Sequence, residues 1–358
     1  SQLLPEDLEV SFFAVSGAES VEAAIKLSTM AKGSGAKYFI SATEGYHGKT
    51  LGALSLTDTE NFSEGFHVGL PKENTKKIEY NNIQEYKDII TKLSKEKIIA
   101  IIVEPIQGQI VEVAKKDYLK EICDISKQNN IAVIFDEIKC GLGRSGNLFS
   151  FLDHECVPDI VTTSKALGGG KNAISAMIAR KKIFNKAYGS INKSTLHTTT
   201  FFGLGEACAT AIETLNIISD ESFLKTIKIK SQNTFQELNK LKDKYPKYIK
   251  SIKGKGLFIG IEFDFDNIIS NVTFKKIKIP FIKSIKTVLM GAIVREYLHK
   301  HKILLHFNNS QPETLVFLPP LIISDEEINI FIDSTKKVLE KGLLNLFVKF
   351  IAGNIKGN

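Results

Sequence analysis

Two residues of types suited to covalent chemistry each follow a short apolar run. Asp136 follows the run Ile131–Phe135, and Lys165 closely follows the run Asp159–Thr163. Both runs are too short for a helix and contain many β-branched or aromatic residues, so they predict buried strands of a parallel sheet. In open α/β sheets the ligand binds outside the carboxyl ends of the strands. We therefore expect Asp136 and Lys165 to lie at one ligand site.

A carboxylate and an amine at the same sheet edge suit a particular class of cofactor. Three glycines, Gly168–Gly170, follow the lysine. Pyridoxal phosphate (PLP) has a cationic ring nitrogen that an aspartate can hold and an aldehyde that a lysine can bind as a Schiff base. Taken singly, Lys165 would more often be a solvated surface lysine and Asp136 a helix cap. The prediction of a PLP site depends on the ordered set of motifs.

The segment Ile131–Gly170 resembles the class III, ornithine-aminotransferase-like branch of PLP-dependent enzymes. The likeness extends from about Phe12 to Leu339, and the motifs keep their order. The sequence LHTTTF at Leu196–Phe201 is most similar to putrescine aminotransferases and related ω-amine aminotransferases.

The resemblance implies the PLP-dependent transferase fold type I. This α/β fold has a mostly parallel sheet flanked by helices in a large domain, plus a smaller C-terminal α/β domain. We expect the PLP-binding domain at residues 1–218, the small domain at 219–342, and an apolar extension at 343–358 that packs on a partner subunit. In the small domain we expect strands at Ile303–His306 and Thr314–Leu318, and a capping box at Ser324–Glu327 that opens the last helix.

A strand at Val10–Val15 leads into Ser16, Gly17 and Ala18, which open a helix. The free N–H groups and the dipole of a helix N-terminus favour an anion. By itself this tripeptide is more often an ordinary helix start. The resemblance assigns Gly17 and Ala18 to the cofactor phosphate. It also implies an additional N-terminal segment, which we expect this chain to lack, as a fragment, a truncated gene product or half of a split protein would.

The resemblance assigns further cofactor contacts. Tyr46 would stack on the pyridine ring, where a flat aromatic partner excludes water from one face. His47 follows it, and we expect it to be a packed residue beside the cofactor. Glu104 follows the apolar run Ile98–Val103 and would lie against Asp136 near the ring oxygen, although such a glutamate can also cap a loop.

Thr199 and Thr200 would reach the phosphate that the other subunit holds, through a hydroxyl and a backbone amide. Threonine runs are also common in edge strands and turns. The resemblance therefore implies a homodimer with composite active sites.

The implied reaction is amino-group transfer in two half-reactions, from a small-molecule amine to a keto or aldehyde acceptor. Lys165 would hold PLP as a Schiff base and then move a proton as general base and acid. Asp136 would keep the ring nitrogen protonated. A lyase or aminomutase on the same fold would need the same two residues, so the sequence leaves these activities open.

Three positions depart from the family pattern. Lys139 stands at the cofactor-binding position where the family usually has a glutamine that donates to the ring oxygen. Gln109 stands where a glutamate is usual, and Val316 where an arginine binds the substrate carboxylate. Because the glutamate and the arginine are absent together, neither leaves a buried charge without its partner. The pattern favours terminal amines, diamines or ω-amino compounds by elimination, unless Lys139, Arg144 or Arg295 supplies another cation. It also fits a non-catalytic homologue.

Composition sets the remaining expectations. With 358 residues, 43% hydrophobic and 24% charged, the chain suits a soluble two-domain protein. Its net charge of +7 is spread over lysines, so we expect no nucleic-acid partner. No apolar run is long enough to span a membrane. The four cysteines lack metal-site spacing, so we expect free thiols, no metal and a cytoplasmic location; they are Cys123, Cys140, Cys156 and Cys208.

Overall fold

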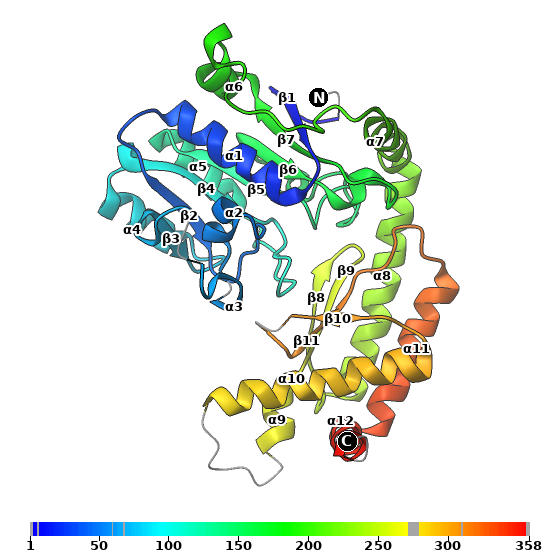
Figure 1. The fold of residues 1–358 in the computed structure, drawn as a ribbon. Helices are drawn as coiled ribbons and strands as arrows, with labels where there is room; N and C mark the ends of the chain where they lie inside the picture. Colours follow the sequence, from blue (N-terminus) through cyan, green and yellow to red (C-terminus); the bar gives the residue numbers. More distant parts are fainter. Residues whose placement is uncertain are drawn as a thin grey trace. The chain divides into compact units, whose positions relative to one another are not determined.

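A computed structural model describes residues 3–5, 7–58, 60–66, 69–270, 279–308 and 311–355. The chain separates into two compact units (Figure 1). The first contains Ser1–Gly108 and Val113–Leu224, and the second contains Gln109–Glu112 and Lys225–Asn358. Within the described residues, no helix is both long enough and apolar enough to cross a bilayer.

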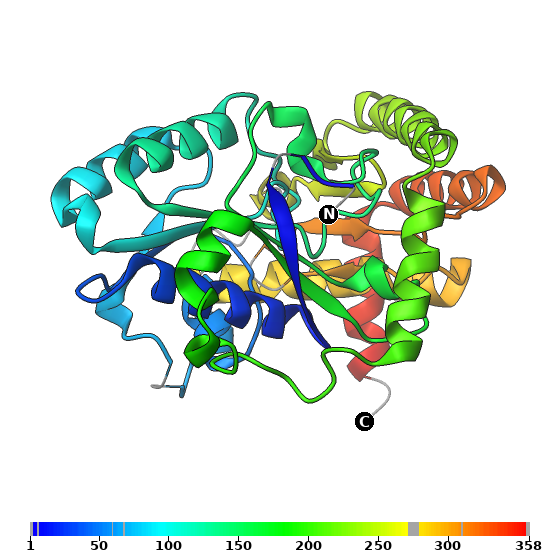
Figure 2. The ribbon, with the colours of Figure 1, turned by 90° about the horizontal axis from the view of Figure 1, so that it is seen from above.

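The first unit is built on a seven-stranded sheet. Its strands are β1 (Leu8–Ala14), β2 (Tyr38–Ala42), β3 (Thr75–Ile78), β4 (Ile98–Val103), β5 (Ala132–Asp136), β6 (Ile160–Thr163) and β7 (Ser175–Arg180). They lie in the order β1-β7-β6-β5-β4-β2-β3. The five strands from β6 to β3 run parallel, and β7 is antiparallel to β6 and to β1, the blue edge strand in Figure 2. The expectation of a mostly parallel sheet is confirmed.

Helices flank this sheet. They are α1 (Gly17–Lys32), α2 (Leu51–Leu56), α3 (Glu60–Ser63), α4 (Ile83–Leu93), α5 (Tyr118–Asn129), α6 (Lys181–Tyr188), α7 (Gly205–Ile218) and the start of α8 (Glu221–Lys244). Short 3₁₀ turns are η1 (Lys72–Asn74), η2 (Lys95–Lys97), η3 (Ser150–His154), η4 (Lys165–Gly168) and η5 (Ile191–Lys193). Helix α1 packs on the sheet and on α6, whereas α5 packs on β5 and α4.

Helix α1 owes its position to a cap and an apolar face. The Glu19 backbone N–H donates to Ser16 Oγ at 3.3 Å, and the Ser16 N–H donates to the Glu19 carboxylate at 2.7 Å. Val21 and Leu27 are fully buried in the core that α1 forms with the sheet. Burying each such side chain contributes about 1.5–3 kcal/mol. The cap and the apolar face together fix the helix N-terminus at the carboxyl edge of the sheet.

The second unit contains a four-stranded antiparallel sheet with the order β10-β11-β9-β8. Its strands are β8 (Ile249–Lys255), β9 (Phe258–Phe263), β10 (His306–Phe307) and β11 (Thr314–Phe317). Its helices are the remainder of α8, α9 (Phe265–Ser270), α10 (Ile279–Glu296), the π-helical turn η6 (Tyr297–His301), α11 (Asp325–Lys341) and α12 (Leu343–Ile355). The capping box at Ser324 is present, and α12 packs against α10 and α11.

The strand expected at Ile303–His306 is wrong. The π-helical turn ends at Lys302 in the left-handed conformation (φ 59°), and regular pairing begins only at His306. The structure also contains a hairpin in the second unit. Gly254 and Gly256 have positive φ, and they turn β8 back into β9.

Candidate functional site

Asp136 and Lys165 come from neighbouring parallel strands. Asp136 is the last residue of β5 and pairs with Thr162 of β6, three residues before Lys165. The two residues therefore leave the same edge of the sheet, as the sequence predicted. Lys165 opens η4 with φ +41°, a strained left-handed conformation for a residue with a side chain. Its side chain is solvent-accessible, whereas Asp136 is 3% exposed.

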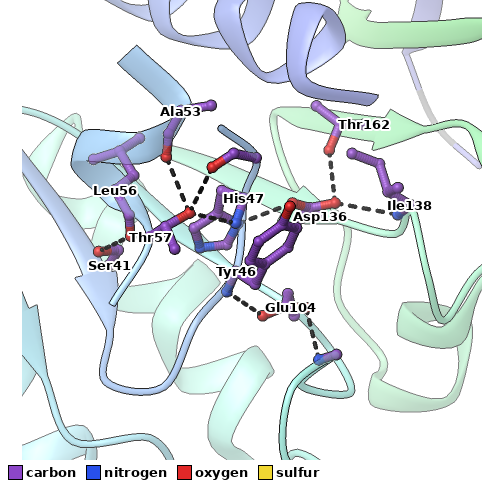
Figure 3. A network of polar contacts seen from close by, with 12 residues as sticks. Ser41, Tyr46, His47, Ala53, Leu56, Thr57, Glu104, Asp136, Ile138 and Thr162 are labelled. Carbon is purple, nitrogen blue, oxygen red and sulfur yellow. Dashed lines mark hydrogen bonds and ion pairs between the residues drawn. The ribbon is translucent and has the colours of Figure 1, made fainter. Parts of the chain in front are cut away.

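The Asp136 carboxylate is held by three donors (Figure 3). Its Oδ2 lies 2.9 Å from Nδ1 of His47. Its Oδ1 accepts the backbone N–H of Ile138 at 3.1 Å and the Thr162 hydroxyl at 3.2 Å. Neither Ile138 nor Thr162 was predicted to take part in the site. Thr162 could have been found from the strand register, because it stands opposite Asp136.

His47 is fixed by its own backbone as well. Its N–H donates to Thr57 Oγ1 at 2.9 Å, and the Thr57 hydroxyl reaches the carbonyls of Gly48 and Ala53 at 3.1 and 3.2 Å. The His47 Nε2 atom is buried and has no hydrogen-bond partner among the described residues. The imidazole thus supports Asp136 on one side and leaves one ring nitrogen unused.

Glu104 ties the Tyr46 loop to the strand ends. Its Oε2 accepts the Tyr46 N–H at 3.0 Å, and its Oε1 accepts the Gly108 N–H at 2.7 Å. Burial raises the pKa of Glu104 to about 7; His47 lowers this pKa and Asp136 raises it. Burial also raises the pKa of the Tyr46 hydroxyl, and the charges of Asp136 and Glu104 add to this effect. These four side chains therefore share one electrostatic environment.

Two lysines, Lys165 and Lys139, lie close to Glu104. The surrounding protein partly desolvates Lys165 and lowers its pKa, while Asp136 and Glu104 raise it. Lys139 donates from Nζ to the Gly108 carbonyl at 2.5 Å. Burial lowers the pKa of Lys139 to about 8, and the positive charge of Lys165 acts in the same direction. The surroundings of both amines thus disfavour their protonated forms relative to a solvated lysine.

The N-terminus of α1 packs against the loops that carry these residues. A Cβ at Gly17 would lie 3.0 Å from Cδ1 of Ile138, so glycine permits this close approach. Gly48 has φ +130°, and a Cβ there would lie 2.8 Å from the Ala18 Cβ. Gly17 and Ala18 are therefore next to both the Asp136 loop and the Tyr46 loop. Their backbone N–H groups belong to the first helical turn, which lacks intrahelical acceptors.

These residues fit PLP. The site offers a buried carboxylate for a cationic ring nitrogen, a strained and accessible lysine at the same sheet edge, and a helix N-terminus suited to a phosphate.

Thr199 and Thr200 stand apart from this cluster. The loop before α7 packs on α1 and β1, where Lys26 Nζ donates to the Leu196 carbonyl at 2.9 Å and the His197 ring lies 4.4 Å from that of Phe12. Among the residues that the structure describes, no hydrogen bond links either threonine to Asp136 or Lys165. Thr199 Oγ1 is buried without a partner, and Thr200 is exposed.

Gln109 and Val316 belong to the second unit. The Gln109 carbonyl accepts the Asn308 side-chain amide at 2.5 Å, and Gln109 is 8% exposed. Val316 is 1% exposed in β11, between Gly260 of β9 and His306 of β10. Neither side chain carries a charge.

Similarity to known proteins covers most of the chain. Residues 1–339 match the family model "Aminotransferase class-III". An acetylornithine aminotransferase from Methanocaldococcus jannaschii is 34% identical over an alignment of 339 residues, and the match covers 92% of this chain and 75% of that protein. Among solved structures, an (S)-enantioselective omega-transaminase from Thermomicrobium roseum matches with a TM-score of 0.82 and 27% identity, over 95% of this chain and 77% of that one.

An ornithine aminotransferase from Toxoplasma gondii, whose structure is described with PLP in partial occupancy at the active site, matches with a TM-score of 0.78 and 27% identity. The match covers 93% of this chain and 74% of that one. The family match and these relatives, together with the fold and the residues at the strand ends, show that the chain belongs to the class III aminotransferases, which depend on PLP.

Proposed function

We propose that this aminotransferase moves the amino group of a terminal amine, diamine or ω-amino compound to a keto or aldehyde acceptor, with Lys165 as the residue that holds PLP. The observation that carries the proposal is the placement of Lys165 and Asp136 at neighbouring strand ends, with Glu104 close to Lys165 and Lys139.

PLP supplies an electron-accepting ring that stabilises negative charge on the substrate carbon next to the amine. Asp136, fixed by three donors, would hold the proton on the ring nitrogen. Tyr46 would cover one face of the ring, and the N–H groups of Gly17 and Ala18 would bind the phosphate.

Lys165 moves the proton at the reacting carbon. A base must be neutral before it can accept a proton, and the lowered pKa of Lys165 increases its neutral fraction. Glu104 fixes the Tyr46 and Gly108 backbones around the ring. Lys139, which donates to the Gly108 carbonyl, would place an amine near the ring oxygen of the bound cofactor.

The choice of terminal amines rests on Gln109 and Val316. With two neutral side chains at these positions, the chain lacks the glutamate and arginine that the family pattern provides for a substrate α-carboxylate. The omega-transaminase among the structural neighbours agrees with this choice.

We also place the enzyme in a homodimer in the cytoplasm. Phe201, Phe202 and Leu204 lie in the loop before α7 and are 61%, 52% and 47% exposed, an apolar surface that a second subunit would bury. In such a dimer, Thr199 and Thr200 on this loop would reach the partner's phosphate. The four cysteines are free thiols, which fits a reducing compartment.

The test begins with the visible spectrum of the PLP-loaded protein before and after borohydride reduction, followed by peptide mapping. We expect a pyridoxyl group on Lys165, its loss in Lys165→Arg, and its retention in the control Lys171→Arg. Diamines, ornithine and N-acetylornithine are then offered with several keto acids and aldehydes. The keto product formed from the donor and the new amine formed from the acceptor are both measured, and their amounts are compared.

A colourless protein without an adduct would show that the chain does not bind PLP and that its motifs are only inherited from related enzymes. An adduct with an isomerised amine or an elimination product, and no new amine on the acceptor, would assign the site to an aminomutase or a lyase.

A further inference from the structure

A second cavity lies at the amino ends of three strands in the first unit. It has a volume of about 460 Å³ and is lined by Ile99 of β4, Ala132 of β5 and Asp159 just before β6. This volume falls within the usual range for small-molecule sites. Asp136 and Lys165 lie at the carboxyl ends of β5 and β6. The cavity is therefore separate from the PLP site.

Helices α1, α5 and α6 each bring a lysine to this cavity. Lys32 lies in the last turn of α1, Lys127 in the last turn of α5, and Lys186 on α6, which packs against α1. None of these three lysines forms an ion pair with a carboxylate among the residues that the structure describes. They leave the cavity with ammonium groups that a ligand can use.

Most carboxylates of the cavity are already paired. Asp7 and Asp159 lie 2.5 and 3.7 Å from the guanidinium of Arg180. Asp124 lies 2.6 Å from the ammonium group of a lysine one turn earlier on α5. Among the lining residues that the structure describes, Glu155 is the remaining acid. The unpaired charge of the cavity is therefore positive.

Lys32 keeps one donor for a ligand. Its Nζ donates to the backbone carbonyls of Lys95 and Asn130 at 3.1 and 2.6 Å. An ammonium group has three N–H donors, so one N–H is not used by these bonds. Burial lowers the pKa of Lys32 and the positive charge of Lys186 acts in the same direction, while Glu96 opposes them. An anion beside Lys32 and Lys186 would reduce the repulsion between them.

Ser28 offers an uncharged donor to the same cavity. It lines the cavity one turn before Lys32 on α1, and it is 1% exposed. Its hydroxyl has no hydrogen-bond partner among the described residues, whereas the neighbouring Thr29 hydroxyl donates to the Ile25 carbonyl at 2.8 Å. A buried hydroxyl without a partner is unfavourable, so an acceptor on a ligand would stabilise it.

We propose that this cavity binds a small oxyanion with at least two negative charges, such as a phosphate group or a dicarboxylate. Lys32, Lys127 and Lys186 supply the positive charge, and the Ser28 hydroxyl donates a hydrogen bond to an oxygen of the anion. Because the lysines come from three helices, they favour an anion whose oxygens point in more than one direction. The inference does not depend on the reaction at the other edge of the sheet.

Titration calorimetry on the PLP-saturated full chain tests the proposal. Inorganic phosphate, succinate and acetate are the probes, at a fixed ionic strength set with sodium chloride. Saturation with PLP keeps the probes away from the cofactor's own phosphate site. We expect one site per chain with a Kd of about 0.1–1 mM for phosphate, succinate or both, and binding about 10-fold weaker for acetate. Phosphate alone would identify a phosphoryl ligand, and succinate alone a dicarboxylate. The PLP absorbance should not change.

Single substitutions locate the site. Ser28→Ala, Lys32→Gln and Lys186→Gln should each weaken binding by about 3- to 10-fold. Lys181→Gln is the matched control, because Lys181 lies on the same helix as Lys186 but does not line the cavity, and its ion pair with Glu9 is exposed. K181Q should bind like the wild type.

The cysteines give a readout in the wild type, which decides the question even if a variant does not fold. Cys123 and Cys156 line the cavity and are half-buried, whereas Cys208 lies on α7. Phosphate or succinate should slow the alkylation of Cys123 and Cys156 by iodoacetamide, measured by peptide mapping, and leave Cys208 unchanged.

Three results would overturn the proposal. The first is a Kd above about 10 mM for both divalent anions, which would be the weak attraction of any anion to surface lysines. The second is alkylation of both cavity cysteines at the same rate with and without the anions. The third is a changed PLP absorbance together with undiminished affinity in S28A, K32Q and K186Q, which would place the anion at the PLP site.

Discussion

The imidazole Nδ1 of His47 lies 2.9 Å from Oδ2 of Asp136, and both side chains are buried. Together with the Ile138 N–H and the Thr162 hydroxyl, this contact fixes the direction in which the carboxylate points. His47 thus acts through Asp136 and is a positioning residue.

Replacing His47 by alanine should reduce kcat by about 10- to 100-fold, because a hydrogen bond to a charged group contributes about 1.5–3 kcal/mol. PLP occupancy should change less, since the phosphate contacts remain. His47→Asn offers a shorter donor and should recover part of kcat, with a pH–rate profile closer to that of the wild type. Equal kcat for the alanine and asparagine variants would contradict the positioning role.

Replacing Asp136 by alanine should have the larger effect. Removing the carboxylate that holds the ring proton should lower kcat by about 10²- to 10³-fold, the cost of losing one partner of a buried charged pair. The N-terminus of α1 still binds the phosphate, so PLP occupancy should fall much less. Occupancy from the spectrum and kcat from product formation separate the two effects, with the exposed Asp153→Asn as a control. A parallel fall in both quantities would refute this division of roles.

Lys139 should leave a signature in the pH dependence of kcat. Burial and the charge of Lys165 lower its pKa to about 8, so it loses its proton near that pH. Because repulsion between two cations is mutual, Lys139→Met should raise the pKa of Lys165 and move the acidic limb of the profile to higher pH. Lys139→Arg retains the charge and should keep this limb near its wild-type position. If K139M and the wild type show the same pH dependence of kcat, the charge of Lys139 does not influence the pKa of Lys165.

Glu137 should make the protein less stable as the pH rises. Burial raises the pKa of Glu137 from 4.5 to about 7, although the Ser150 and Phe151 N–H groups and the Cys140 thiol partly oppose this shift. The folded state thus binds more protons than the unfolded state between these values. The resulting stabilisation is complete below pH 4.5 and is lost as the pH rises through 7, and it amounts to about 3 kcal/mol.

Urea unfolding at pH 5 and pH 8 measures this loss of stability. Glu137→Gln cannot titrate and should flatten the pH dependence, while Glu104 retains its own contribution of the same sign. The exposed Glu73→Gln should leave the slope unchanged. An undiminished slope in E137Q would show that the carboxyl titrates normally.

Much of the first unit could be predicted from the sequence, because buried parallel strands are continuous runs of β-branched residues. The run Ile98–Val103 is completely buried as β4. Strand β3 (Thr75–Ile78) was missed because Lys76 and Lys77 make it read as a loop. In the structure, the Lys77 ammonium donates hydrogen bonds to Ser41 Oγ at 2.8 Å and to the Leu56 carbonyl at 2.6 Å.

The candidate site was predictable as a set of strand-end residues but not as a network. Asp136, Glu104 and Lys165 follow apolar runs, so their shared edge could be inferred. The bond between Thr162 and Asp136 depends on the register of β5 and β6, and the bond between Thr57 and the His47 backbone depends on the turn before α2. Neither geometry follows from local residue preferences.

Mixed dimers can test whether Thr200 serves the other subunit. Thr200→Asp would repel a phosphate, and Lys165→Ala removes the covalent residue, so each variant alone should be inactive. If each site combines Lys165 of one subunit with Thr200 of its partner, a dimer of the two variants contains one site with both native residues. Random reassociation should then restore about a quarter of the wild-type activity, because half of the dimers are mixed and each has one intact site. If Thr200 served its own chain, every site would lack one residue, and mixing would restore nothing.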